Sequence, residues 1–190
     1  MQIDRDAPEI LSSQEIYHGE QVGLSIDIVR EQGHVQKREV VLHPGSAAIV
    51  ALFADDTIAL VRQYRHPSRR YVLEIPAGAL EHDEVPEEAA GRELKEEVGL
   101  VARRIEKLCE FFVSPGFLQE KMWVYLATDL SECEQELEDD EFIEVVRLPF
   151  SRAIKMITDG EIEDAKTIIG LMLAAPRIGV SAFEPDYPAA

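Results

Sequence analysis

The feature that most constrains the fold of this chain is the segment 86–98, which has the periodicity of an amphipathic helix. Its apolar residues recur every four positions and so share one face, which predicts packing against a sheet; they are Ala90, Leu94 and Val98. Pro86 suits the first turn of a helix, and Gly99 suits the residue that follows the last turn. We therefore predict a helix over residues 86–98 with one face toward a core.

The other face of this helix is acidic, because Glu93, Glu96 and Glu97 stand three and four positions apart. Side chains at that spacing are neighbours, and like charges there destabilise a helix unless something neutralises them. We expect the three carboxylates to point away from the core. Two interpretations stay open at this point: an acidic face in contact with solvent, which is the usual case, or a site for a cation such as Mg²⁺, which prefers carboxylate oxygens.

The residues around the helix favour the second interpretation. Gly78 is followed after five residues by Glu84, and after seven more by R-E-L-K-E-E-V-G-L over residues 92–100. This segment resembles the Nudix hydrolase signature, G-x5-E-x7-R-E-U-x-E-E-x-G-U with U a bulky apolar residue, at every fixed position. Nine defined positions within 23 residues make a chance match very improbable.

The resemblance implies a Nudix fold of the α+β class, a mixed β-sheet sandwiched between helices. It also implies hydrolysis of a nucleoside diphosphate linked to another group. Two or three Mg²⁺ ions, or Mn²⁺ in their place, would be held by Glu93, Glu96, Glu97 and the backbone carbonyl of Ala77, to neutralise the diphosphate and lower the pKa of a bound water.

Three further signature residues have expected structural roles. By the resemblance, Glu84 and Arg92 would form an ion pair that holds the loop and the helix together, and a direct part in the chemistry is the alternative. Gly78 would supply a backbone conformation that a side chain forbids.

Segments outside the signature indicate the branch of the family. Residues 61–67 (V-R-Q-Y-R-H-P) and 73–78 (L-E-I-P-A-G) look like the ADP-ribose pyrophosphatase branch, as do Pro115, fifteen residues after Leu100, and residues 140–146 (D-E-F-I-E-V-V). The likeness runs from about residue 42 to residue 175 and implies hydrolysis of ADP-ribose to AMP and ribose 5-phosphate. The alternatives are another nucleoside diphosphate sugar such as GDP-mannose, or a nucleotide sensor without activity, although such proteins usually lose signature glutamates that this chain keeps.

The same resemblance assigns further roles in the site. Arg65 would bind the substrate's phosphates, which suits a guanidinium fork. Arg62 is either a second substrate contact or a surface charge, Glu74 would serve the ribose or a metal-bound water, and Glu120 is a further substrate-binding candidate.

The general base is assigned by its place in the likeness rather than by its charge. Glu141 matches the loop glutamate that deprotonates the attacking water, so it joins Glu93 and Glu97 as a catalytic residue. The neighbouring acids Asp139, Asp140 and Glu144 keep the choice of base open.

The N-terminal segment reads as a β-hairpin over residues 20–42 with its turn at Gln32 and Gly33. Two antiparallel strands alone are marginally stable, so this hairpin must lie on the rest of the chain or on a second subunit. In the branch that the chain resembles, the N-terminal sheet is exchanged between subunits and helps to form the base pocket. We therefore expect a homodimer through these strands, with Tyr17 as a weak candidate for stacking on the base.

The remaining pattern completes the expected organisation. Strands are predicted at 47–53, 57–63, 71–75, 105–113, 122–127 and 142–148, helices at 151–158 and 164–175, and an exposed acidic loop at 132–141. These elements predict three parts: an N-terminal hairpin and dimerisation region (1–43), a Nudix hydrolase domain (44–175) and a C-terminal tail (176–190).

Charge and composition exclude several classes of protein. The net charge is −18, of which residues 78–100 contribute −6 and residues 131–144 contribute −8, so non-specific nucleic-acid binding is not expected. No apolar run reaches the ~18 residues of a membrane span, and the first twenty residues hold no signal-peptide core. Cys109 and Cys133 lack the spacing of a zinc site or a disulfide framework, so a cytoplasmic protein is expected.

Overall fold

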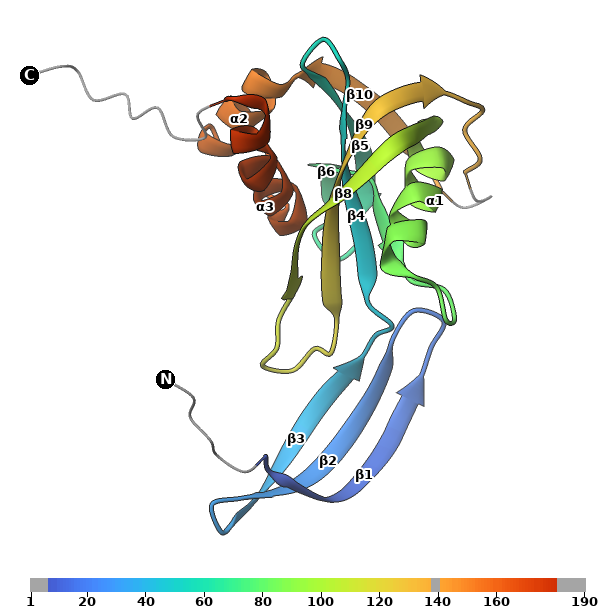
Figure 1. Ribbon diagram of the computed structural model, residues 1–190. Helices are drawn as coiled ribbons and strands as arrows, with labels where there is room; N and C mark the ends of the chain where they lie inside the picture. The colour runs from blue at the N-terminus through green and yellow to red at the C-terminus, as the bar shows by residue number, and fades with distance from the viewer. Residues whose placement is uncertain (1–6, 138–140, 181–190) are drawn as a thin grey trace, which may run out of the picture. The chain divides into compact units, whose positions relative to one another are not determined.

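The computed structural model describes residues 7–137 and 141–180 (Figure 1). Its contacts divide the chain into two units. One comprises the described residues up to Gly45 together with Phe111–Lys121, and the other comprises Ser46–Glu110 and the described residues from Met122 onward. The stretch 111–121 of the first unit lies in the segment that the sequence assigned to the hydrolase domain.

The first unit contains a three-stranded antiparallel sheet in the order β1 (Glu9–His18), β2 (Gly23–Glu31), β3 (His34–Leu42). The predicted hairpin is present as β2 and β3, and its turn places Gln32 and Gly33 at φ values of 49° and 82°. Strand β1 was not predicted. All of its residues are exposed, so alternating burial leaves no signal in its sequence, and backbone pairing with β2 defines it instead.

The second unit is built on a seven-stranded sheet in the order β10-β5-β4-β9-β8, with β6 paired to β5 and β7 paired to β4. The strands are β4 (Ser46–Leu52), β5 (Thr57–Arg65), β6 (Arg70–Glu74), β7 (Ala77–Ala79), β8 (Leu100–Phe112), β9 (Lys121–Glu132) and β10 (Ile143–Pro149). Strands β4 and β9 are parallel, whereas β4 and β5 are antiparallel, so the sheet is mixed as expected.

Three strands of this sheet differ clearly from the sequence prediction. Strand β9 runs to Glu132 rather than to residue 127. Strand β8 begins at Leu100 rather than at residue 105, because the charged pair Arg103 and Arg104 hides the alternation of an edge strand that has a single buried residue. Strand β7 lies where a loop was expected. Its three residues pair with β4, and this pairing places the signature glycine in the sheet.

Helices cover both faces of this sheet (Figure 1): α1 (Pro86–Val98) lies on one, and α2 (Phe150–Thr158) and α3 (Ala165–Ala174) lie on the other, followed by a short 3₁₀ helix (Ala175–Ile178). All seven residues of β4 are buried. Ile49 packs with Leu94 of α1, whereas Val50 points to the opposite face, where it approaches Gly170 of α3. The central strand therefore anchors both helical layers.

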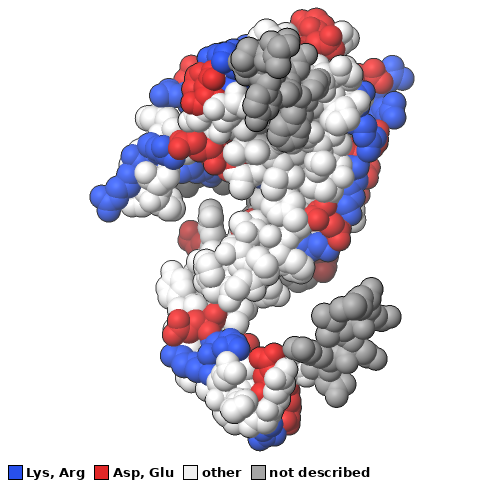
Figure 2. All heavy atoms as spheres, turned by 90° about the vertical axis from the view of Figure 1, so that its left-hand side faces the viewer, with Lys and Arg blue, Asp and Glu red and all other residues white. Residues whose placement is uncertain are grey.

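The helix ends follow the sequence. Pro86 occupies the first turn of α1, and Gly99 adopts the left-handed conformation at φ 67° while its N–H bonds the carbonyl oxygen of Lys95. On the face that carries α2 and α3, acidic and basic side chains are interspersed (Figure 2). Within the described residues, no helix has the length and apolar character that crossing a membrane requires.

Candidate active site

Helix α1 turns two of the three glutamates of its predicted acidic face toward the sheet. Glu93 is 6% exposed and Glu97 is 2% exposed, whereas the side chain of Glu96 is 31% exposed. The expectation that all three carboxylates point away from the core is therefore wrong for Glu93 and Glu97. The reason is strand β7, which packs beside this face of the helix: Glu97 Oε2 accepts a hydrogen bond from the N–H of Ala77 at 2.9 Å.

The signature glycine makes room for this arrangement. A Cβ atom on Gly78 would lie 2.0 Å from Oε1 of Glu93, far inside contact distance. Gly78 is not among the described glycines with a positive φ. Its role is thus the close approach of a carboxylate rather than the unusual backbone conformation that we expected.

The loop before α1 is tied to the helix by the ion pair expected from the signature. Arg92 donates from Nε to Glu84 Oε1 at 2.8 Å and from Nη2 to Glu84 Oε2 at 3.0 Å. The same guanidinium donates from Nη1 to Glu93 at 2.7 Å and to Glu96 at 2.9 Å. Arg92 therefore holds the loop, the helix and two of the acidic side chains in one network.

The two buried carboxylates resist ionisation. Burial raises the pKa of Glu97 to about 8, and the charges of Glu93 and Glu141 act in the same direction against the N–H of Ala77. Burial also raises the pKa of Glu93 to about 7, although the charge of Arg92 opposes this. The positive charge near the pair is thus too small to hold the two pKa values at their ordinary level. An added cation would stabilise the ionised forms.

The donor chemistry of this region fits a divalent metal ion. Carboxylate and carbonyl oxygens are the ligands that Mg²⁺ prefers, and Glu93, Glu96, Glu97 and Ala77 supply them. In this structure the oxygens of Glu93 and Glu96 bond Arg92 instead, and among the described residues no three acidic, His or Cys side chains converge on a common point.

Glu141 lies close enough to the pair for its charge to raise the pKa of both Glu93 and Glu97. It lines a shallow hollow of about 420 Å³ together with Arg62, Tyr71, Leu137, Phe142, Ile143 and Glu144. Phe142, which the sequence did not single out, is 81% exposed there, and such an aromatic side chain suits stacking on a planar ring. Asp139 and Asp140, the neighbouring candidates for the base, lie outside the described residues.

The predicted substrate-binding arginines differ in their surroundings. Arg62 stands over the ring of Tyr71 at 4.4 Å and pairs with Glu144 at 3.2 Å across β5 and β10. Arg65 instead donates two hydrogen bonds to Glu74, both at 2.8 Å. Arg65 and Glu74, which the sequence assigned separately, are therefore one ion pair, and their roles toward a substrate remain predictions.

Lys166 is a second partner of Glu74 that the sequence analysis missed. A signal was present: a lysine in the first turn of a helix stands at the positive end of the helix dipole, where a cation is unfavourable. Such a residue indicates a partner elsewhere in the fold. Glu120 and Tyr17, the remaining candidates, belong to the N-terminal unit, and their contacts with a substrate also remain predictions.

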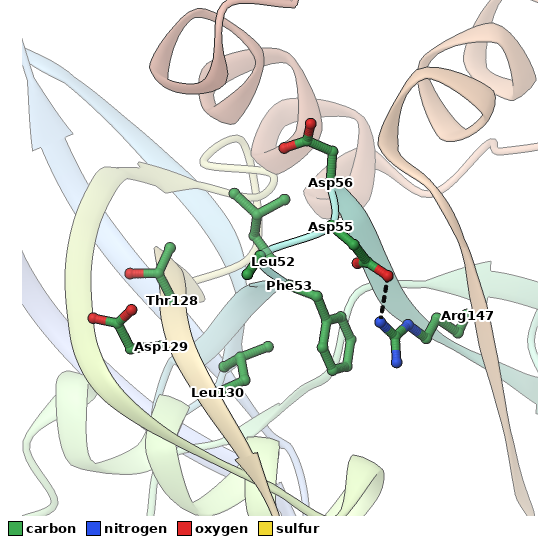
Figure 3. A pocket seen from close by; sticks show the side chains of 9 residues that line it. Leu52, Phe53, Asp55, Asp56, Thr128, Asp129, Leu130 and Arg147 are labelled. Atoms are coloured by element: carbon green, nitrogen blue, oxygen red, sulfur yellow. Dashed lines mark hydrogen bonds and ion pairs between the residues drawn. The ribbon is translucent and has the colours of Figure 1, made fainter.

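A larger hollow, of about 610 Å³, lies beside the turn between β4 and β5 (Figure 3). There Arg147 pairs with Asp55 at 2.9 Å and stands over the ring of Phe53 at 3.7 Å. None of the predicted site residues lines this hollow. The larger volume of this hollow therefore does not single out the predicted site residues.

Comparisons with known proteins find relatives over most of the chain. An ADP-ribose pyrophosphatase of Bacillus subtilis is 41% identical over 83% of this chain and 86% of its own length. A methanol dehydrogenase activator of Bacillus methanolicus is 38% identical over 85% and 89%. A GDP-mannose pyrophosphatase of Yersinia enterocolitica is 37% identical over 79% and 84%.

The fold and the family are also supported independently. A crystal structure of an ADP compounds hydrolase superposes with a TM-score of 0.80 at 24% identity, over 92% of this chain and 95% of the other. This confirms the predicted sheet between helices. The model of the NUDIX domain matches residues 42–169, a span that contains the whole signature and the strands around it. The chain belongs to the Nudix family.

Proposed function

We propose that this protein hydrolyses the diphosphate of ADP-ribose to AMP and ribose 5-phosphate in the presence of Mg²⁺. The observation that carries the proposal is the pair of buried carboxylates, Glu93 and Glu97, packed against strand β7 with raised pKa values. A cation would stabilise the ionised forms of such a pair, and it would also neutralise a diphosphate. The name of the Bacillus subtilis relative supports ADP-ribose as the substrate.

The chain's own residues can divide the reaction between them. Water attacks one phosphorus, a new P–O bond forms, and the bond to the bridging oxygen breaks. Glu141 accepts the proton of the attacking water, and Arg65 binds the phosphate oxygens. A divalent ion held by Glu93, Glu96, Glu97 and the carbonyl of Ala77 would neutralise the diphosphate and lower the pKa of the water.

GDP-mannose is the second candidate substrate, because one relative carries that name at 37% identity. The support is weaker than for ADP-ribose, whose named relative is 41% identical over a larger share of the chain. A nucleotide sensor without activity is disfavoured, since Glu93, Glu96 and Glu97 are all retained.

A homodimer in the cytoplasm completes the proposal. Large apolar side chains stand exposed on the N-terminal sheet, among them Ile10 at 64%, Val35 at 59% and Tyr17 at 58%. Burial of such side chains in a second copy would remove them from water. The proposed dimer therefore forms through the strands β1–β3.

The test is a panel of nucleoside diphosphate compounds offered to the purified full-length protein with Mg²⁺. Phosphate released after addition of alkaline phosphatase gives the rates, and chromatography identifies the products. We expect ADP-ribose to have the highest kcat/KM and to give AMP and ribose 5-phosphate. A higher kcat/KM for GDP-mannose would replace the proposed substrate, and no turnover of any compound would reject the hydrolase.

A further inference from the structure

Four charged side chains join the ends of β5 and β6 to the first turn of α3. We call Arg65, Glu74, Asp164 and Lys166 the Glu74 cluster. The side chain of Glu74 is 2% exposed and accepts two hydrogen bonds from Arg65, at 2.8 Å each, and one from Lys166. Lys166 also donates to Asp164 at 3.1 Å. Two positive and two negative charges therefore cancel within the cluster.

The start of helix α3 fixes the lysine in place. Asp164 caps the helix by accepting hydrogen bonds from the N–H of Thr167 at 2.9 Å and from its hydroxyl at 2.6 Å. The Thr167 hydroxyl accepts a hydrogen bond from the N–H of Ile75 at 2.8 Å, directly after Glu74. The side chain of Lys166 is only 12% exposed. Its ammonium group is thus held against Glu74 by the fold.

Arg65 uses one edge of its guanidinium for this cluster. A guanidinium has five N–H donors in a planar fork, and within the described part of the chain only Nε and Nη2 of Arg65 donate. The side chain is 41% exposed. Its charge lowers the pKa of Glu97, so Arg65 stands near the carboxylate pair of α1. The remaining edge can receive an anionic group.

We propose that Lys166 is a positioning residue that balances the charge of Glu74, so that the positive charge of Arg65 remains available to the substrate's diphosphate. This inference rests on the proposed function. Without Lys166, Arg65 would face the carboxylates of both Glu74 and Asp164. The cluster would then carry a net charge of −1 next to Glu97 and would repel a diphosphate.

Charge-matched variants test this directly. K166M gives the cluster a net charge of −1, E74Q gives +1, and the double variant E74Q/K166M returns it to zero. We expect the KM of K166M for ADP-ribose to rise about tenfold at low salt with kcat within about threefold of the wild type. K166R should recover a KM close to that of the wild type, and the double variant should bind inorganic diphosphate more tightly than K166M. A purely structural lysine would not produce this order.

A control variant and a binding measurement separate charge from folding. Lys155 of α2 pairs with Asp159 at 2.9 Å and is 64% exposed, so K155M should leave KM unchanged. Titration with inorganic diphosphate in EDTA measures affinity without turnover, and circular dichroism checks the fold. If K166M does not fold, K166Q takes its place, because it removes the charge and keeps a hydrogen-bond donor for Glu74.

The outcomes distinguish the two proposals. An unchanged KM in the neutral Lys166 variant, or a double variant no better than that single variant, would overturn the role of Lys166 and leave the hydrolase intact. If the wild type does not hydrolyse ADP-ribose, the proposed function fails. The titration with inorganic diphosphate then decides the role of Lys166 by itself, with weaker binding to the lysine variant as the supporting result.

Discussion

Replacement of Glu97 by glutamine should stabilise the fold and abolish the activity. Glu97 is 2% exposed, and burial raises its pKa from 4.5 to about 8. The unfolded chain ionises this carboxyl at a lower pH than the folded chain does. The fold therefore loses stability as the pH rises from about 4.5 through about 8, and the loss is complete above that range. Glutamine has no proton to lose and removes this dependence.

The expected size follows from the pKa. A tenfold difference in acidity between the folded and the unfolded chain corresponds to about 1.4 kcal/mol, so a rise in pKa from 4.5 to about 8 sets an upper limit of about 5 kcal/mol. The charge of Glu93 accounts for part of the raised pKa of Glu97. We therefore expect the free energy of unfolding of E97Q to exceed that of the wild type by roughly 3 kcal/mol at pH 9. For a chain of this size that is a rise in Tm of about 6–12 °C. At pH 4 the two proteins should be nearly equal.

The assay is thermal unfolding in EDTA at several pH values, together with turnover of ADP-ribose at saturating Mg²⁺. E97Q should lose turnover by about 100-fold or more, since a charge partner and ligand of the metal is gone. Glu88, exposed on the same helix, provides the control: E88Q should show neither effect. If E97Q gained no stability at pH 9, ionised Glu97 would not destabilise the fold, and the raised pKa of this carboxyl would be refuted. Normal turnover would exclude this face of the helix from the chemistry.

Three further predictions address other parts of the site and the assembly. E141Q should lower kcat by about 10²- to 10⁴-fold with little change in KM, and the same loss in E144Q instead would move the base to Glu144. G78A should fold yet lose most turnover, because its Cβ would lie 2.0 Å from Oε1 of Glu93 and would displace that carboxylate. In the control G91A the new atom meets only Ile105, at 3.5 Å. Equal activity of the two variants, with circular dichroism to check that both fold, would contradict this prediction. Deletion of residues 1–42 should abolish the dimer in light scattering and weaken ADP-ribose binding in titration, and a dimeric truncation with normal affinity would refute a shared site.

The parts of the fold that were predictable carry local signals. The helix 86–98 was visible from its apolar spacing, its proline and its terminal glycine, and the structure places both ends where these residues indicate. The turn at Gln32 and Gly33 was visible from its composition. Strand β1 had no such signal, because none of its residues is buried and its pairing with β2 depends on the backbone.

The parts of the site that escaped prediction depend on contacts between distant segments. Helical spacing showed that Glu93 and Glu97 share a face, but only strand β7 determines that this face is buried. The approach of Glu93 to Gly78 is likewise invisible in the sequence. Lys166 meets Glu74 across 92 positions, so no local pattern could join them.

The two sets of buried acids in this unit differ in how their charge is balanced, and this difference indicates where a ligand belongs. Burial of a carboxylate is costly unless a partner compensates it. Burial alone would raise the pKa of Glu74, but Arg65 and Lys166 bring it below its ordinary value. The charge of that carboxylate is therefore balanced by the protein's own side chains. Glu93 and Glu97 keep raised pKa values in spite of Arg92 and the N–H of Ala77. The first arrangement stabilises the framework. The second has a deficit of positive charge that a divalent cation would fill, and that cation would in turn bind a diphosphate.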